Sequence, residues 1–168
     1  GYMSNIADLS IDENGYVTTP YNSRFYAVSN SGGTDTAEGS SGEIILSAQM
    51  ETTYCNDGSD FNTGNGRFTA PVDGAYEFHA AALLRALSNA GSGELTFYKN
   101  GSNLSSRSFG YGNVGSGGSS NDHQHMHIHA IVNLTAGDYV DFRVYDLNGS
   151  IDFYFDRGLG YFSGKLLG

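Results

Sequence analysis

Residues 123–134 alternate between polar and apolar side chains, and this alternation constrains the fold more than any other stretch. Successive side chains of a β-strand point to opposite faces of a sheet. One face of such a strand is apolar and suited to a core, and it consists of Met126, Ile128, Ala130, Val132 and Leu134. The other face begins with four of the chain's five histidines, which would lie about 6.8 Å apart: His123, His125, His127 and His129. The sequence therefore predicts a long strand with one buried face and one histidine face.

The composition favours strands in the rest of the chain as well. The 168 residues include 24 glycines, two prolines, 12 tyrosines and 10 phenylalanines. Aromatic residues are enriched in strands, and glycines are enriched in the turns between them. The alanine-rich segment 80–87 has helical propensity, but it directly continues an alternating strand, and we interpret it as strand and loop. The length is sufficient for one domain with a sizeable core.

Turn signals divide the chain into many short candidate strands. A first strand is expected at 24–28, and further strands near 43–50, 66–69, 74–84, 93–98, 104–109, 124–134, 138–145, 151–155 and 160–167. Asn100-Gly101 is one of several dipeptides between them that are typical of tight turns. Polar loops are expected at 29–42 and 110–122. Many short strands joined by regular turns indicate a sandwich or a barrel.

The charge and the missing motifs argue against several function classes. A formal net charge of −10 with no basic patch makes nucleic-acid binding improbable. No apolar run is long enough for membrane insertion, and no signal peptide is apparent. Cys55 is the single cysteine, so no disulfide can form within the chain. The sequence contains neither a Gly-x-Ser-x-Gly nucleophile motif nor a phosphate-binding loop, and we expect no enzyme activity.

An ordered set of motifs resembles one known family. Residues 61–80 read FNTGNGRFTAPVDGAYEFHA, which resembles the signature of the complement C1q globular-head family, a branch of the tumour-necrosis-factor-like jelly rolls. The segments LTFYKNG (95–101), LTAGDYV (134–140) and FSGKLL (162–167) resemble later motifs of that family, in the family's order. Two signature positions depart from the pattern, Met50 and Ala80, which indicates a distant member. The residues of these motifs expected to form the core are Phe61, Phe68, Gly74, Tyr76, Phe78, Phe162 and Gly164.

The resemblance implies a fold and an assembly. It implies an all-β, ten-strand antiparallel jelly-roll sandwich, C1q/TNF-like, that assembles as a homotrimer. We expect residues 1–22 to be a lead-in or stalk-connecting segment and residues 23–168 to be the globular head. In that family the strand corresponding to 124–134 lies in the inner sheet, near the three-fold axis. His79 is expected on the non-core face of its own strand, where we interpret it as structural; the alternative that the resemblance implies is a position close to the trimer interface.

The resemblance also implies a non-enzymatic recognition or structural head. A shorter resemblance of residues 9–20 to segments of bacteriophage and bacterial structural proteins favours the C-terminal domain of a virion fibre or decoration protein. Its location would then be the virion surface or the extracellular space. Its partners would be a cell-surface or glycan receptor, or other virion proteins. The alternative is a secreted C1q-like lectin or innate-immune binding head.

The histidine face predicts a metal site if the chains form such a trimer. Two successive histidines from each chain would offer six nitrogens around the axis, which suits octahedral Fe, Ni, Co or Mn. One histidine from each chain would suit Zn with an open position. The alternatives are a metal-free histidine interface and an exposed polar face.

Two further metal sites are possible from the sequence, a calcium site and a cupin-type site. Calcium is a candidate cofactor, because the resemblance implies that such heads can bind it and late carboxylates could supply its oxygen ligands: Asp138, Asp141, Asp146, Asp152 and Asp156. Their spacing matches no fixed calcium loop, and the alternative is that they are solvated loop carboxylates. A cupin-type metalloenzyme is the other, because Gly117, His123 and His125 match the start of the cupin metal motif. The cupin motif then requires a glutamate, where this chain has His129 and Ala130.

Overall fold

The computed structural model describes residues 10–11, 13–15, 17–18, 22–29, 34–37, 43–45, 47, 50–86, 91–104, 110–114, 123–146, 151–154 and 160–168. The described part contains no α-helix, and a 3₁₀ turn covers Asp57–Ser59. Its strands are β1 (Ser10–Ile11), β2 (Val17–Thr18), β3 (Arg24–Val28), β4 (Thr34–Ala37), β5 (Glu43–Ile45), β6 (Thr52–Asn56), β7 (Phe61–Asn62), β8 (Arg67–Thr69), β9 (Gly74–Ala86), β10 (Gly91–Lys99), β11 (Ser102–Asn103), β12 (Gly110–Val114), β13 (His123–Leu134), β14 (Tyr139–Asp146), β15 (Ile151–Tyr154) and β16 (Tyr161–Leu166). No described helix is long and apolar enough to cross a membrane.

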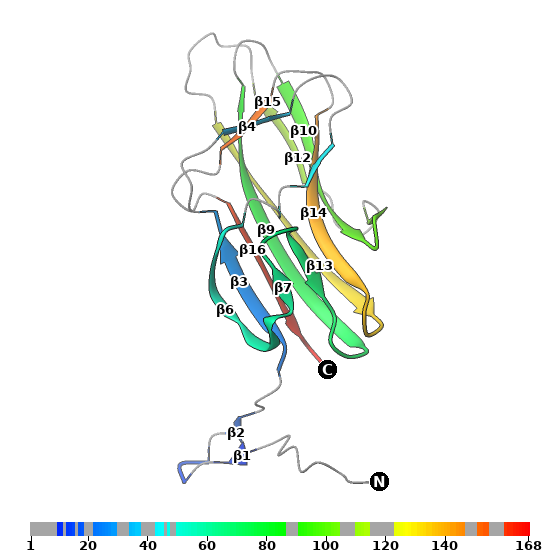
Figure 1. Cartoon of the computed structure of the whole chain (residues 1–168). Helices are drawn as coiled ribbons and strands as arrows, with labels where there is room; N and C mark the ends of the chain where they lie inside the picture. Colours follow the sequence, from blue (N-terminus) through cyan, green and yellow to red (C-terminus); the bar gives the residue numbers. More distant parts are fainter. Residues whose placement is uncertain are drawn as a thin grey trace.

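Two antiparallel sheets form the sandwich (Figure 1). Sheet I has the order β4-β15-β9-β16-β3-β6, and β13 pairs with the other side of β9. Sheet II has the order β11-β10-β14-β8-β7, with β12 on β10 and β5 on β14. Strands β1 and β2 pair only with each other among the described strands, so they add nothing to either sheet. The long strands β9 and β10 pair with different short strands at their two ends.

The fold class expected from the sequence is confirmed, although several details differ. Each main sheet has seven described strands, because two short strands share one side of a long strand in three places: β15 and β16 on β9, β11 and β12 on β10, and β5 and β8 on β14. The predictions of a continuous loop at 29–42 and at 110–122 were wrong, since β4 and β12 lie within them. Strands β6, β7 and β11 were missed. Of the strand expected at 43–50, β5 covers Glu43–Ile45, and residues 105–109 of the strand expected at 104–109 lie outside the described residues. The interpretation of 80–87 as strand and loop agrees with β9, which continues to Ala86.

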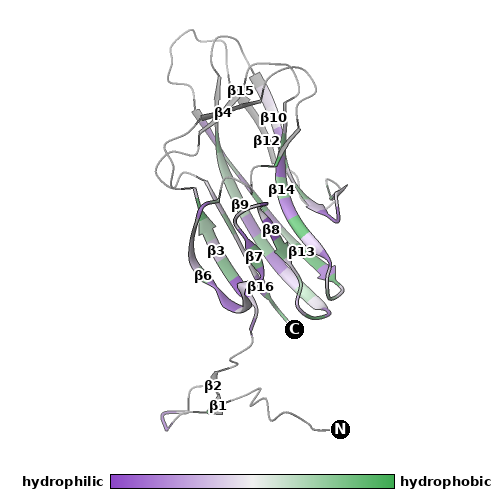
Figure 2. Ribbon diagram, viewed as in Figure 1, coloured by the Kyte–Doolittle hydropathy of each residue, from purple (hydrophilic) through white to green (hydrophobic). Residues whose placement is uncertain are grey.

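Alternating apolar residues from both sheets fill the core. Figure 2 shows this alternation as bands of green and purple along strands such as β14. Eight aromatic side chains are at most 2% exposed: Phe25, Phe61, Phe68, Tyr76, Phe78, Phe97, Phe142 and Phe162. The ring of Phe162 contacts the rings of Phe25 at 4.7 Å and Phe142 at 5.2 Å between centroids, so it joins the two sheets. Met50 and Ala80, which depart from the family signature, are also fully buried.

Two glycine-containing positions show how the backbone permits this packing. Asn100 and Gly101 both have positive φ angles, of 50° and 77°, which is the pattern of a type I′ hairpin turn between β10 and β11. Gly164 lies on the core side of β16. A Cβ atom added there would come within 2.6 Å of the Phe78 ring and 2.8 Å of the Phe25 ring.

Candidate functional site

The histidines of β13 lie on the outer face of sheet I. Strand β13 pairs with β9 along its whole length, from His123 opposite Arg85 to Leu134 opposite Gly74. The even-numbered residues 126–134 of β13 are at most 5% exposed and belong to the core. His125, His127 and His129 are exposed on the opposite face. The side chain of His123 lies outside the part that the structure describes.

The described histidines of β13 separate into two groups. His125 and His127 contact each other, with 2.6 Å between His125 Nδ1 and His127 Nε2. Their rings are nearly perpendicular, with centroids 4.3 Å apart. Partial burial, and then repulsion from His125, lowers the pKa of His127, so the neutral imidazole is favoured there.

The second group joins β13 to β9 and β16. His129 stands opposite His79 in the register, and their ring centroids are 4.5 Å apart. Both imidazoles approach one carboxylate oxygen, Glu77 Oε1, which lies 3.2 Å from His129 Nε2 and 3.5 Å from His79 Nε2. Lys165 of β16 holds the other oxygen, Oε2, at 3.0 Å. The hydrogen bond from Lys165 is the largest of the effects that lower the pKa of Glu77, so this carboxyl is ionised at neutral pH.

Tyrosines continue this face across β16, β3 and β6. Tyr161 lies 6.4 Å from the His127 ring and stacks on Tyr26 at 5.7 Å between centroids. Tyr26 in turn lies 5.9 Å from Tyr54, whose side chain is 75% exposed. On β13 the next outward residue after His129 is Ile131, an aliphatic side chain that is 54% exposed. We call this surface the histidine–tyrosine face: Tyr26, Glu77, His79, Tyr54, His125, His127, His129, Ile131, Tyr161 and Lys165.

Sequence reasoning missed part of this face. It named the histidines of β13 but gave Glu77 and Lys165 no role, and it treated His79 as structural. The available signal was the spacing of Glu77 and His79, two apart on a strand, which repeats the spacing of His127 and His129. The strand register was needed to bring these pairs together.

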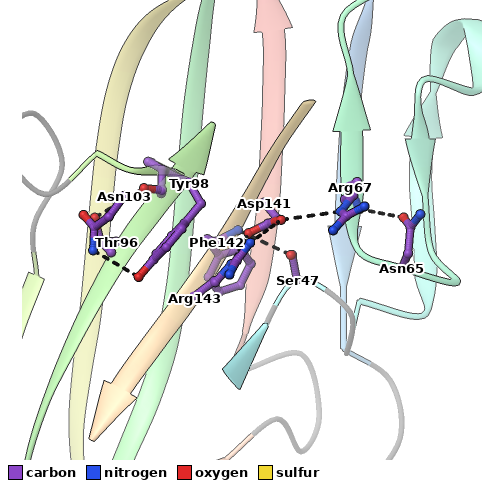
Figure 3. A network of polar contacts seen from close by, with 10 residues as sticks. Ser47, Asn65, Arg67, Thr96, Tyr98, Asn103, Asp141, Phe142 and Arg143 are labelled. Carbon is purple, nitrogen blue, oxygen red and sulfur yellow. Dashed lines mark hydrogen bonds and ion pairs between the residues drawn. The ribbon is translucent and has the colours of Figure 1, made fainter. Parts of the chain in front are cut away.

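The two aspartates named as calcium candidates and described in full have other partners. Figure 3 shows the fully buried Asp141 held by Arg143, with Arg143 Nε 2.6 Å from Asp141 Oδ1 and Arg67 Nε 3.6 Å from Oδ2. Arg143 lies over the Tyr98 ring at 4.1 Å, and Arg67 over the Tyr139 ring at 4.2 Å. Both carboxylate oxygens of Asp141 are therefore engaged by guanidinium groups.

Asp138 is bound in a separate cluster at the turn before β14. Lys99 Nζ lies 2.7 Å from Asp138 Oδ2, and the backbone N–H of Thr135 and the side chain of Asn100 also donate to this carboxylate. These donors lower the pKa of Asp138 to about 2. The side chains of Asp146, Asp152 and Asp156 lie outside the described residues. Within the described part, the one group of three clustered metal-ligand side chains is Glu77, His79 and His129.

Known proteins are similar to this chain over nearly the whole sandwich. The family model described as C1q domain matches residues 25–167. The globular domain of zebrafish complement 1qA protein is similar in structure, with a TM-score of 0.55 at 15% identity over 88% of this chain and 98% of that one. Murine APRIL, in crystal structures at pH 8.5 and pH 5.0, gives TM-scores of 0.56 and 0.57 at 9% and 10% identity, covering 87% of this chain and 99% of that one. No curated protein matches the chain.

Proposed function

The chain belongs to the C1q domain family as a distant member, and on that basis we propose that it is a non-enzymatic head that assembles as a homotrimer. Its subunits would associate through the histidine–tyrosine face. The observation that carries the proposal is the composition of that face. It is the outer surface of a sheet, and aromatic and aliphatic side chains are exposed on it: Tyr26, Tyr54 and Ile131.

Several features of the face support an interface. Exposed apolar surface that is rimmed by polar groups marks interaction sites on soluble proteins. Tyrosine is enriched in interfaces because its ring is apolar and its hydroxyl group hydrogen-bonds. Tyr26 and Tyr161 stack side by side, and Tyr54 and Ile131 lie on either side of them with more than half of each side chain exposed. Two further copies of the chain would bury these groups around a three-fold axis.

Light scattering or sedimentation of the tag-free chain at micromolar concentration tests the assembly. We expect the mass of three chains, each of 17.9 kDa. Ile131→Asp should dissociate the trimer because a carboxylate would be desolvated in the interface without a partner. Val72→Asp is a matched control, because Val72 is a similarly exposed aliphatic residue, 48% exposed, in the turn before β9. A monomeric wild-type chain, or a trimer that tolerates Ile131→Asp, would contradict the proposal.

The proposed setting is a virion surface, as the head of a fibre or decoration protein. The residues before the sandwich support a connecting role, because β1 and β2 pair only with each other in the described part and Ile11 is 64% exposed. The ligand would then be a cell-surface or glycan receptor. The sequence encoded upstream of this chain tests the setting. A long β-rich or coiled-coil fibre would support it, whereas a signal peptide followed by collagen Gly-X-Y repeats would favour a secreted lectin-like head.

The cupin-type metalloenzyme has less support. A metal centre inside a jelly roll would need the histidines of β13 on the buried side of the strand. His125 and His129 instead point away from the core, and the alternate residues Met126 and Ile128 fill it.

A further inference from the structure

We propose that Glu77, His79 and His129 form a zinc-class metal site on the outer face of sheet I. The three ligand atoms are two imidazole nitrogens and one carboxylate oxygen, and all lie within 4.8 Å of one another. This ligand set differs from the site predicted from the sequence, which used only the histidines of β13. It uses one histidine of β13 and two residues of β9. All three ligands belong to one chain, so the site does not require the trimer proposed above.

The spacing of the ligand atoms matches metal coordination. In a tetrahedral zinc site with bonds of about 2.1 Å, neighbouring ligand atoms are separated by roughly 3.4 Å. Glu77 Oε1 lies 3.2 Å from His129 Nε2 and 3.5 Å from His79 Nε2. Two edges of a tetrahedron are therefore in place before any ion is added.

The carboxylate is oriented for this role. Lys165 occupies Glu77 Oε2 at 3.0 Å, which leaves Oε1 directed at the two imidazoles. Carboxylates that bind metals are commonly held by an outer hydrogen bond of this kind. Lys165 also balances the charge of Glu77. His129 Nε2 lies within hydrogen-bonding distance of Glu77 Oε1, at 3.2 Å, and His79 Nε2 approaches the same oxygen at 3.5 Å. A divalent cation would replace this hydrogen bond and bind the three atoms together.

The strands fix this arrangement. Glu77 and His79 are two residues apart on β9, so their side chains share one face. His129 pairs directly with His79, and Lys165 pairs directly with Glu77. Ligands on adjacent paired strands are more rigid than ligands on loops. The two imidazoles are about half exposed, so an ion can enter from solvent.

The ligand chemistry selects the class of metal. Imidazole and carboxylate together suit Zn²⁺ and its neighbours Co²⁺ and Ni²⁺, whereas Ca²⁺ and Mg²⁺ prefer oxygen ligands. Three protein ligands leave at least one position open, which points outward from the sheet. On the histidine–tyrosine face, that position would be available to water or to a group of a neighbouring subunit.

Calorimetry with Zn²⁺ on the tag-free, chelator-stripped chain tests the site. We expect one ion per chain. His79→Ala and His129→Ala should each weaken binding by roughly 10- to 100-fold or more, since loss of even an outer-shell partner has an effect of that size. His125→Ala is the matched control, because it removes an exposed histidine from the same strand and face.

Three outcomes would overturn the proposal: no zinc binding by the wild-type chain, unchanged affinity in His129→Ala, or an equal loss in His125→Ala. The last result would show that the loss of affinity is not specific to the proposed ligands. Circular dichroism of each variant checks that the sheet is intact. Light scattering of the same samples in chelator measures assembly separately, so failure of the metal site and failure of the trimer are distinguishable.

Discussion

Replacement of Gly164 by alanine tests whether the core is as tightly packed as the structure indicates. The new Cβ atom would lie 2.6 and 2.7 Å from two atoms of the Phe78 ring and 2.8 Å from the Phe25 ring. Both rings are at most 2% exposed and contact further aromatic rings, so neither can move without displacing its neighbours.

The magnitude follows from two opposing effects. Overpacking a core by one methyl group costs about 1–3 kcal/mol, and three contacts under 3.0 Å place this site near the upper limit. Alanine also restricts the unfolded chain, which stabilises the fold by about 0.4–1 kcal/mol. We therefore expect Gly164→Ala to lower the free energy of unfolding by about 2 kcal/mol.

Urea denaturation followed by circular dichroism or tyrosine fluorescence measures this change, at fixed protein concentration because association affects apparent stability. Gly64→Ala is the control, since its Cβ would meet only the Asn62 side chain, at 3.1 Å, and we expect a change within about 0.5 kcal/mol. In a Phe78→Leu background the cost of Gly164→Ala should fall by about 1 kcal/mol or more, because the ring is gone. A cost equal to that of Gly64→Ala, or one undiminished by Phe78→Leu, would refute the packing argument.

Two further predictions concern carboxylates. The pKa of Asp138 is about 2 in the folded chain and 3.8 for a free aspartate side chain. Its contribution to stability is therefore complete above about pH 4 and is lost as the pH falls through 2. We expect the free energy of unfolding of Asp138→Ala to depend less steeply on pH in this range than that of the wild type. Asp141→Ala should cost about 3–5 kcal/mol in urea denaturation, because it leaves two guanidinium groups without their buried partner. Asp57→Ala removes the exposed ion pair with Arg24 and should change stability little. Equal effects of Asp141→Ala and Asp57→Ala would contradict a stabilising role of the buried Asp141 carboxylate.

The strands that the sequence predicted are those with strong local patterns. Strand β13 alternates over its whole length, and β9 places Tyr76 and Phe78 on one face and continues into alanines that pack in the core. Strand β4 reads TDTA and strand β12 reads GYGNV, so neither contains an alternation of apolar and polar residues, although Thr, Tyr and Val favour strands. They form because the edges of β15 and β10 offer unpaired backbone groups, and such tertiary pairing leaves no periodic signal in the sequence.

The candidate site also depends on strand pairing that the sequence does not reveal. That the histidines of β13 share one face follows from a period of two, but the separation of His125 and His127 from His129 depends on cross-strand neighbours. The opposite residue is Ala81 for His127 and His79 for His129. Only the register between β9 and β13, which residues 87–122 separate in the chain, determines these neighbours. Glu77 was overlooked for this reason.

The two faces of β13 restrict how this strand can change in evolution. Its buried residues fill the core while the residues between them form the histidine–tyrosine face. Insertion or deletion of one residue near the middle would exchange the faces of one half, because side chains alternate with a period of two. Imidazoles would then enter the core, and apolar side chains would reach the surface. Relatives that retain this face should therefore differ along the strand by substitution, with changes in length confined to the turns at its ends.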